Sequence, residues 1–126
     1  MDHQLKIKIM SDAYMEAIDF TECHEDNPEL YNAIGFSDEL ILHAINTCKK
    51  FLEITGDKIP DSLLSQAGHD LWLTRNGHGA GFWDRPELYG EDLANYLTSL
   101  CEHGNQFSEV WVYTGDDNLI YVMGDE

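Results

Sequence analysis

The most regular pattern in this sequence is a helix signature that runs from Ser37 to Gly56. Serine is favoured immediately before a helix because its side-chain oxygen accepts a backbone N–H of the first turn, and glycine is common just past the end. Between them, apolar residues recur at helical spacing, namely Leu40, Ala44, Ile45, Cys48, Phe51 and Leu52. The pattern predicts an amphipathic helix whose apolar face packs against another helix.

A second amphipathic helix is predicted from Met10 to Phe20. Its apolar positions are separated from an acidic face formed by Asp12, Glu16 and Asp19. We expect this helix to be the packing partner of the one that follows Ser37. Residues 4–10 alternate between apolar and basic side chains, so they form either a short strand or the first turns of the helix.

The segment from His69 to Trp83 differs in character and predicts a β-hairpin. Residues 70–75 form the first strand, Asn76-Gly77 the turn, and residues 80–83 the return strand. An Asn-Gly pair favours such a turn because both central positions of a two-residue hairpin loop require positive φ.

The rest of the chain predicts one more helix and a second hairpin. The helix runs from Leu88 to His103, and residues 110–113 and 119–123 are strands joined by a turn at residues 115–118. We therefore expect an α+β fold in a single domain, residues 1–126. Its N-terminal helices pack with a C-terminal ββαββ unit that has an antiparallel sheet.

The distribution of charge limits the classes of partner. The chain has 24 Asp and Glu against 7 Lys and Arg, a formal net charge of −17, and no Lys or Arg occurs between Lys8 and Lys49 or after Arg85. Carboxylates one helical turn apart stand about 5–6 Å apart, which is comparable with the charge spacing along a nucleic-acid strand. Such a surface is repelled by nucleic acids and anionic membranes, and it is attracted to a basic protein surface.

Two acidic faces are the predicted partner-binding surfaces. The first consists of Asp12, Glu16, Asp19, Glu22, Glu25 and Asp26, and the second of Glu87, Glu91 and Asp92. The alternative interpretation is a solvated surface that keeps the protein soluble and monomeric.

The predicted hairpin is an alternative site. Acid–base groups and anion-binding side chains of a hydrolytic or ligand-binding domain would be His69, Asp70, Arg75, His78, Asp84 and Arg85. In the structural interpretation, the two aspartates pair with the two arginines across the strands, while Trp72, Phe82 and Trp83 fill the core. The glycines of residues 77–81 lack the spacing and the lysine of a phosphate-binding loop, and no nucleophile accompanies them, so we expect no enzyme.

No metal site and no cofactor are predicted. Cys23-His24 and Cys101-Glu102-His103 lack the ligand spacing of structural zinc sites, and residues 116–118 indicate a turn rather than a calcium loop. The three cysteines are expected to be reduced thiols, with Cys48 and Cys101 in the core. Without a membrane-spanning or signal segment, the expected location is the cytoplasm, that of the host bacterium if the protein is encoded by a phage.

Residues 69–84 read His-Asp-Leu-Trp-Leu-Thr-Arg-Asn-Gly-His-Gly-Ala-Gly-Phe-Trp-Asp. This run resembles a segment of small acidic proteins of bacteriophages and related mobile elements, most of them uncharacterised, in which a helix and a Gly-Asp-Asp hairpin follow. The Gly-Asp-Asp run begins here at Gly115, and the resemblance extends from Gly68 to Tyr121. It implies a phage or mobile-element origin and brings no catalytic residues.

These observations lead to a functional hypothesis. We expect a small non-enzymatic protein that docks on the basic, nucleic-acid-binding surface of a host enzyme or defence complex and blocks it as a nucleic-acid mimic, as anti-restriction and anti-CRISPR proteins do. The alternatives are a ligand-binding or hydrolytic domain built on the predicted hairpin, and an acidic scaffold or assembly protein. No motif indicates the target or the oligomeric state.

Overall fold

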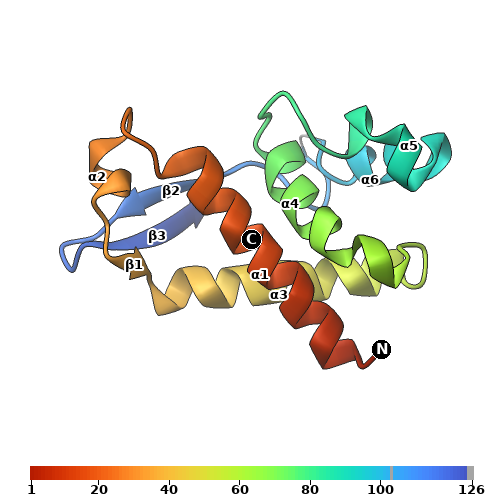
Figure 1. The fold of residues 1–126 in the computed structure, drawn as a ribbon, viewed down its shortest axis with the longest axis horizontal. Coiled ribbons are helices and arrows are strands. Elements are labelled where there is room, and N and C mark those ends of the chain that lie inside the picture. The colour runs from red at the N-terminus through yellow and green to blue at the C-terminus, as the bar shows by residue number, and fades with distance from the viewer. Residues whose placement is uncertain (103, 125–126) are drawn as a thin grey trace.

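The computed structural model describes residues 1–102 and 104–124, and its fold class is α+β, as predicted. Helices occupy most of the chain, and a small sheet lies at one end of the molecule while α5 and α6 lie at the other (Figure 1). In chain order, the elements are α1 (His3–Glu22), α2 (Pro28–Tyr31), β1 (Gly35–Phe36), α3 (Asp38–Thr55), the 3₁₀ turn η1 (Asp61–Leu63), α4 (Leu64–Arg75), the 3₁₀ turn η2 (Phe82–Asp84), α5 (Pro86–Tyr89), α6 (Glu91–Ser99), β2 (Val110–Thr114) and β3 (Leu119–Gly124).

The two predicted N-terminal helices are confirmed. The Ser37 side chain accepts the N–H of Leu40 at 3.1 Å, and Gly56 follows the last residue of α3. Residues 4–10 belong to α1, so the helical alternative is correct there. The α1 helix packs against both α3 and α4. One member of the predicted apolar stripe, Ile45, is 37% exposed instead of buried.

The predicted hairpin at residues 69–83 is wrong, because this region contains α4, a loop and η2. The buried residues of α4 follow helical spacing and include a glycine and two ionic residues: Leu64, Ala67, Gly68, Asp70, Leu71, Trp72 and Arg75. Gly77 has φ +65°, donates to the Thr74 carbonyl, and is followed by His78, which donates to the Leu73 carbonyl. These two bonds form a Schellman helix end, so the Asn-Gly pair closes a helix rather than a hairpin.

The sheet is mixed rather than antiparallel. The second predicted hairpin is confirmed: β2 and β3 pair antiparallel, with Val112 opposite Val122. However, β1 adds to the other edge of β3 in parallel, with Gly35 opposite Leu119, so the order is β1-β3-β2. The predicted ββαββ unit is therefore incorrect, since its second hairpin pairs with an N-terminal strand instead of another hairpin.

The helix predicted from Leu88 to His103 is interrupted. Gly90, with φ +84°, separates α5 from α6, and α6 ends at Ser99. The expected final residue of that helix, His103, lies outside the described residues. In the part of the chain that the structure describes, no helix is long and apolar enough to cross a membrane.

Aromatic contacts join the helices in one apolar core. Tyr14 of α1 contacts Trp72 of α4 edge to face, with ring centroids 5.5 Å apart. Phe51 of α3 stacks on Phe82 of η2 at 5.8 Å. Trp72 and Phe82 are buried, as the structural interpretation predicts, whereas Trp83 is 50% exposed.

The buried thiols yield a first testable prediction. Burial, followed by the charge of Asp19, raises the pKa of Cys23 to about 11, and burial raises the pKa of Cys101 to about 12 and that of Cys48 as well. Since the thiolate is the reactive form, a pKa raised from 9 to about 11 slows Cys23 labelling at pH 8 about a hundredfold. We expect slow labelling by Ellman's reagent in native protein and fast labelling of all three cysteines in urea.

The raised pKa values of these thiols also predict how alkaline pH changes the stability of the fold. Above pH 9, the ordinary pKa of an exposed thiol, the unfolded thiols ionise before the folded ones, so the free energy of unfolding decreases as the pH rises from 9 toward 11. Urea titrations at pH 8 and pH 10 measure this change. A Cys23→Ser control isolates the half-buried thiol, and rapid labelling of native protein at pH 8 would contradict the burial of these side chains.

Candidate functional site

The first predicted acidic face forms along α1. Asp12, Glu16 and Asp19 are exposed on successive turns, as the spacing predicts. Lys8 neutralises part of this charge, because its Nζ lies 2.9 Å from Asp12, and His69 Nε2 lies 3.5 Å from Glu16. The α1 stripe is therefore less negative than its carboxylates alone indicate.

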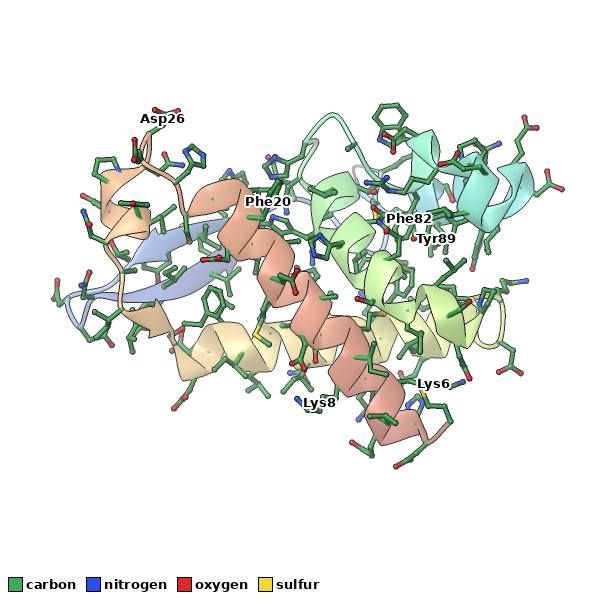
Figure 2. The ribbon with its side chains drawn as sticks, in the orientation of Figure 1. Lys6, Lys8, Phe20, Asp26, Phe82 and Tyr89 are labelled. Atoms are coloured by element: carbon green, nitrogen blue, oxygen red, sulfur yellow. The ribbon has the colours of Figure 1, made fainter. Side chains whose placement is uncertain are left out.

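The other predicted carboxylates occupy three different places. Glu22 is half-buried, with His78 Nε2 3.0 Å from its Oε2. Glu25 and Asp26 are exposed in the loop after α1, where Figure 2 shows Asp26 at the tip. The second face, Glu87 of α5 with Glu91 and Asp92 in the first turn of α6, is exposed at the opposite end of the molecule (Figure 1).

The alternative site residues belong to separate contacts rather than to one cluster. Asp70 is fully buried and accepts Arg85 Nε at 2.8 Å and Gln66 Nε2 at 3.1 Å on Oδ1, and the Tyr89 hydroxyl at 2.7 Å on Oδ2. The bond to Asp70 raises the pKa of Arg85, and burial followed by the bond to Asp70 raises the pKa of Tyr89. The Asp70–Arg85 pair thus joins α4 to the segment before α5, not two strands.

Arg75, the second predicted cation of this site, lies in a different buried network. Its Nε and Nη2 donate to the Ser108 carbonyl at 2.8 and 2.7 Å, and Nη1 donates to the Tyr14 hydroxyl at 3.1 Å. Tyr14 also hydrogen-bonds His43 Nε2 at 2.8 Å. These bonds tie the end of α4 to α1, α3 and the segment before β2.

The remaining three residues also have structural contacts. His69 and His78 contact the α1 carboxylates Glu16 and Glu22, and Asp84 Oδ1 accepts the backbone N–H of Gly81 at 2.9 Å. The predicted cross-strand pairing of Asp70 and Asp84 with the two arginines is replaced by a single ion pair, Asp70–Arg85, between two helical segments. Within residues 1–102 and 104–124, no group of three or more His, Cys, Asp or Glu side chains is placed to hold a metal ion.

Tertiary structure creates an acidic surface that the sequence did not single out. The parallel pairing of β1 with β3 brings the two lysine- and arginine-free stretches of the chain together. Asn118 Nδ2 donates to the Asn32 carbonyl at 3.1 Å, and the Thr114 hydroxyl donates to Glu29 at 3.4 Å. We call the exposed carboxylates around this junction the acidic pole: Glu25, Asp26, Glu29, Asp38, Glu39, Asp116 and Asp117.

The carboxylates of the acidic pole come from residues 23–39 and 110–124, and these two stretches contain no lysine or arginine. The nearest lysines along α3, at positions 49 and 50, lie about 16 Å or more from Asp38 at the helical rise of 1.5 Å per residue. Lys6 and Lys8 lie toward the N-terminal end of α1, away from the sheet (Figure 2). The carboxylates of the acidic pole are therefore not offset by a lysine or arginine within the stretches that supply them.

The acidic pole also exposes large apolar side chains. Ile34 is 75% exposed beside β1, and Trp111 of β2 is 55% exposed. Trp111 and Tyr113 share the outer face of the sheet with Met123, since Trp111 pairs with Met123 across the strands. Exposed apolar and aromatic side chains on one face are typical of a protein-binding surface. The alternation of buried and exposed residues along β2 identifies this exposed face. The sequence of the two strands did not indicate which other segments lie beside them.

Comparison with known proteins identifies no relative: no family model, no curated protein and no solved structure matches this chain.

Proposed function

We propose that this chain is a phage-type inhibitor that binds the basic, nucleic-acid-binding surface of a host enzyme or defence complex and excludes nucleic acid from it. The observation that carries the proposal is the acidic pole, where two lysine- and arginine-free stretches meet. Its carboxylates occupy the places that phosphates would take in a basic groove, and association releases the counterions held by both surfaces.

The exposed apolar residues support binding of a protein rather than a free cation. Charge attracts and orients a partner, but affinity between proteins comes largely from a few buried aromatic and apolar side chains. Trp111, Tyr113 and Ile34 supply exposed side chains of this kind, and Tyr113 lines one hollow together with Asp116 and Asp117. The α1 stripe, Asp12, Glu16 and Asp19, extends the acidic surface in this proposal.

The test is a tagged pull-down from bacterial lysate at physiological salt, with and without excess duplex DNA. We expect a nucleic-acid-binding protein to be captured and then displaced by DNA. The variant Glu25→Lys/Asp26→Lys/Asp116→Lys changes three exposed carboxylates of the acidic pole that have no structural role in the contacts above, and it should abolish capture, because reversing close charges at an interface costs several kcal/mol.

A matched control variant distinguishes the effect of charge in the acidic pole from the effect of total net charge on capture. Glu53→Lys/Asp57→Lys/Glu102→Lys makes the same net change at exposed positions outside both acidic faces and the acidic pole, so it should retain capture. Equal loss in both variants would show that total charge alone matters. Capture that DNA does not displace would remove the mimicry proposal.

A further inference from the structure

A cavity of about 160 Å³ opens where the end of α1, the end of α4 and the start of β2 meet. Its lining combines negative charge with aromatic rings: Glu22, Trp72, His78, Glu109 and Trp111, together with Asn76 and the strand residues Val110 and Val112. Only Glu22 among these belongs to the acidic faces predicted from the sequence. No lysine or arginine is among these lining residues, so neither side chain pairs with the carboxylates from within the lining.

The carboxylate of Glu22 is held in place before any ligand arrives. His78 Nε2 and the Thr21 hydroxyl each lie 3.0 Å from its Oε2, and Thr21 in turn accepts the indole N–H of Trp72 at 2.9 Å. The side chain of Glu22 is still 22% exposed at the cavity. A fixed carboxylate binds a cation with less loss of side-chain entropy than a mobile surface carboxylate does.

The strand side of the cavity is equally ordered. Asn76 accepts the Val110 N–H at 3.0 Å and donates to the Trp72 carbonyl at 3.0 Å, which fixes β2 against the end of α4. This contact places Glu109 and the exposed indole of Trp111 beside Glu22 in one lining. An indole face attracts cations, and guanidinium groups stack on it more readily than ammonium groups do.

We propose that this cavity binds the guanidinium of an arginine side chain of the partner protein. The planar group can stack on the indole of Trp111 while it donates forked hydrogen bonds to the carboxylates of Glu22 and Glu109. This assignment rests on the proposed function, because a nucleic-acid-binding surface is rich in arginine. It adds a binding site for one defined side chain to the acidic and apolar surface of the proposed function.

The test uses the isolated protein and a capped glycine–arginine–glycine tripeptide, so it does not depend on capture of the partner. NMR spectra report the indole N–H signals of Trp72, Trp111 and Trp83. We expect saturable shifts at Trp111 and Trp72 and none at Trp83, which is exposed and does not line the cavity. A tripeptide with citrulline, the neutral analogue of arginine, should cause no shift, and one with lysine should bind more weakly.

Variants assign the binding to this cavity. Glu109→Gln should weaken arginine binding about tenfold, as expected for loss of one charge-assisted hydrogen bond, and Trp111→Ala should abolish the shift at Trp72. Glu53→Gln, an exposed change of the same kind on α3, should leave binding unchanged.

Equal shifts with citrulline, or binding unaffected by both cavity variants, would overturn the assignment. Capture of a DNA-displaceable partner in that case would leave the proposed inhibitor function standing without this binding site. Conversely, arginine binding without any DNA-displaceable partner would refute the function and keep the site.

Discussion

Replacement of Arg85 by methionine is expected to lower the free energy of unfolding by about 3–5 kcal/mol, the usual result of leaving one member of a buried ion pair behind. The reason is the unequal burial of the two partners. Asp70 is fully buried, whereas the side chain of Arg85 is 30% exposed. Without Arg85, the carboxylate of Asp70 retains Tyr89 and Gln66 but loses its charged partner in a site that water does not reach.

Neutralising Asp70 instead should lower the free energy of unfolding less than replacing Arg85, and this difference tests the explanation. Asp70→Asn leaves the exposed guanidinium of Arg85 within reach of water, so we expect a smaller loss than in Arg85→Met. The double variant Asp70→Asn/Arg85→Met should be more stable than Arg85→Met alone, because it removes the unpaired buried charge. Urea unfolding followed by tryptophan fluorescence measures all three. Equal effects of the two single changes would contradict the assigned roles.

Gly68→Ala is the second change for which we expect a large effect. In an exposed helix, alanine is more favourable than glycine by about 1 kcal/mol. At position 68, however, a Cβ atom would overlap the carbonyl oxygen of Met10 and lie 3.0 Å from the Cβ of Ala13. The obstacle is the backbone of α1, so the two helices must separate. We expect a net loss of about 1–3 kcal/mol, the range observed for overpacked cores.

Ser65→Ala provides the matched control for this prediction. Ser65 lies on the same helix and is exposed, so the change should be neutral or slightly stabilising. Thermal unfolding of both variants by circular dichroism gives the comparison. If Gly68→Ala were as stable as Ser65→Ala, the close approach of α1 and α4 in this structure would be incorrect.

The sequence correctly predicted those elements in which several neighbouring residues all indicate the same structure. The Ser37 cap, the apolar spacing of α3 and the Gly56 stop all indicate the same helix, and they are confirmed. The strands β2 and β3 are short runs rich in β-branched and aromatic residues and are separated by a four-residue turn, so their hairpin was also predictable. In both cases, the residues that determine the element lie next to one another in the chain.

The α4 helix was missed because its buried face is not purely apolar. Asp70 and Arg75 are buried by partners on distant segments, Tyr89 with Arg85 and Tyr14 with Ser108, which the local pattern does not contain. Gly77 needs positive φ in a hairpin turn and in a helix end alike, so the Asn-Gly pair did not discriminate between them. Counting the core face from Leu64, with Gly68 and Arg75 included, would have indicated a helix.

By itself, the sequence determined the net charge of −17, the two stretches without lysine or arginine, and the helices and hairpin whose patterns are local. Only the tertiary structure decided where those charges lie. Residues 35–36 pair with residues 119–120 across more than 80 positions of the chain, and this parallel contact assembles the acidic pole. A two-residue strand carries too little local pattern to be predicted, because it is stabilised by the neighbouring strand rather than by its own sequence.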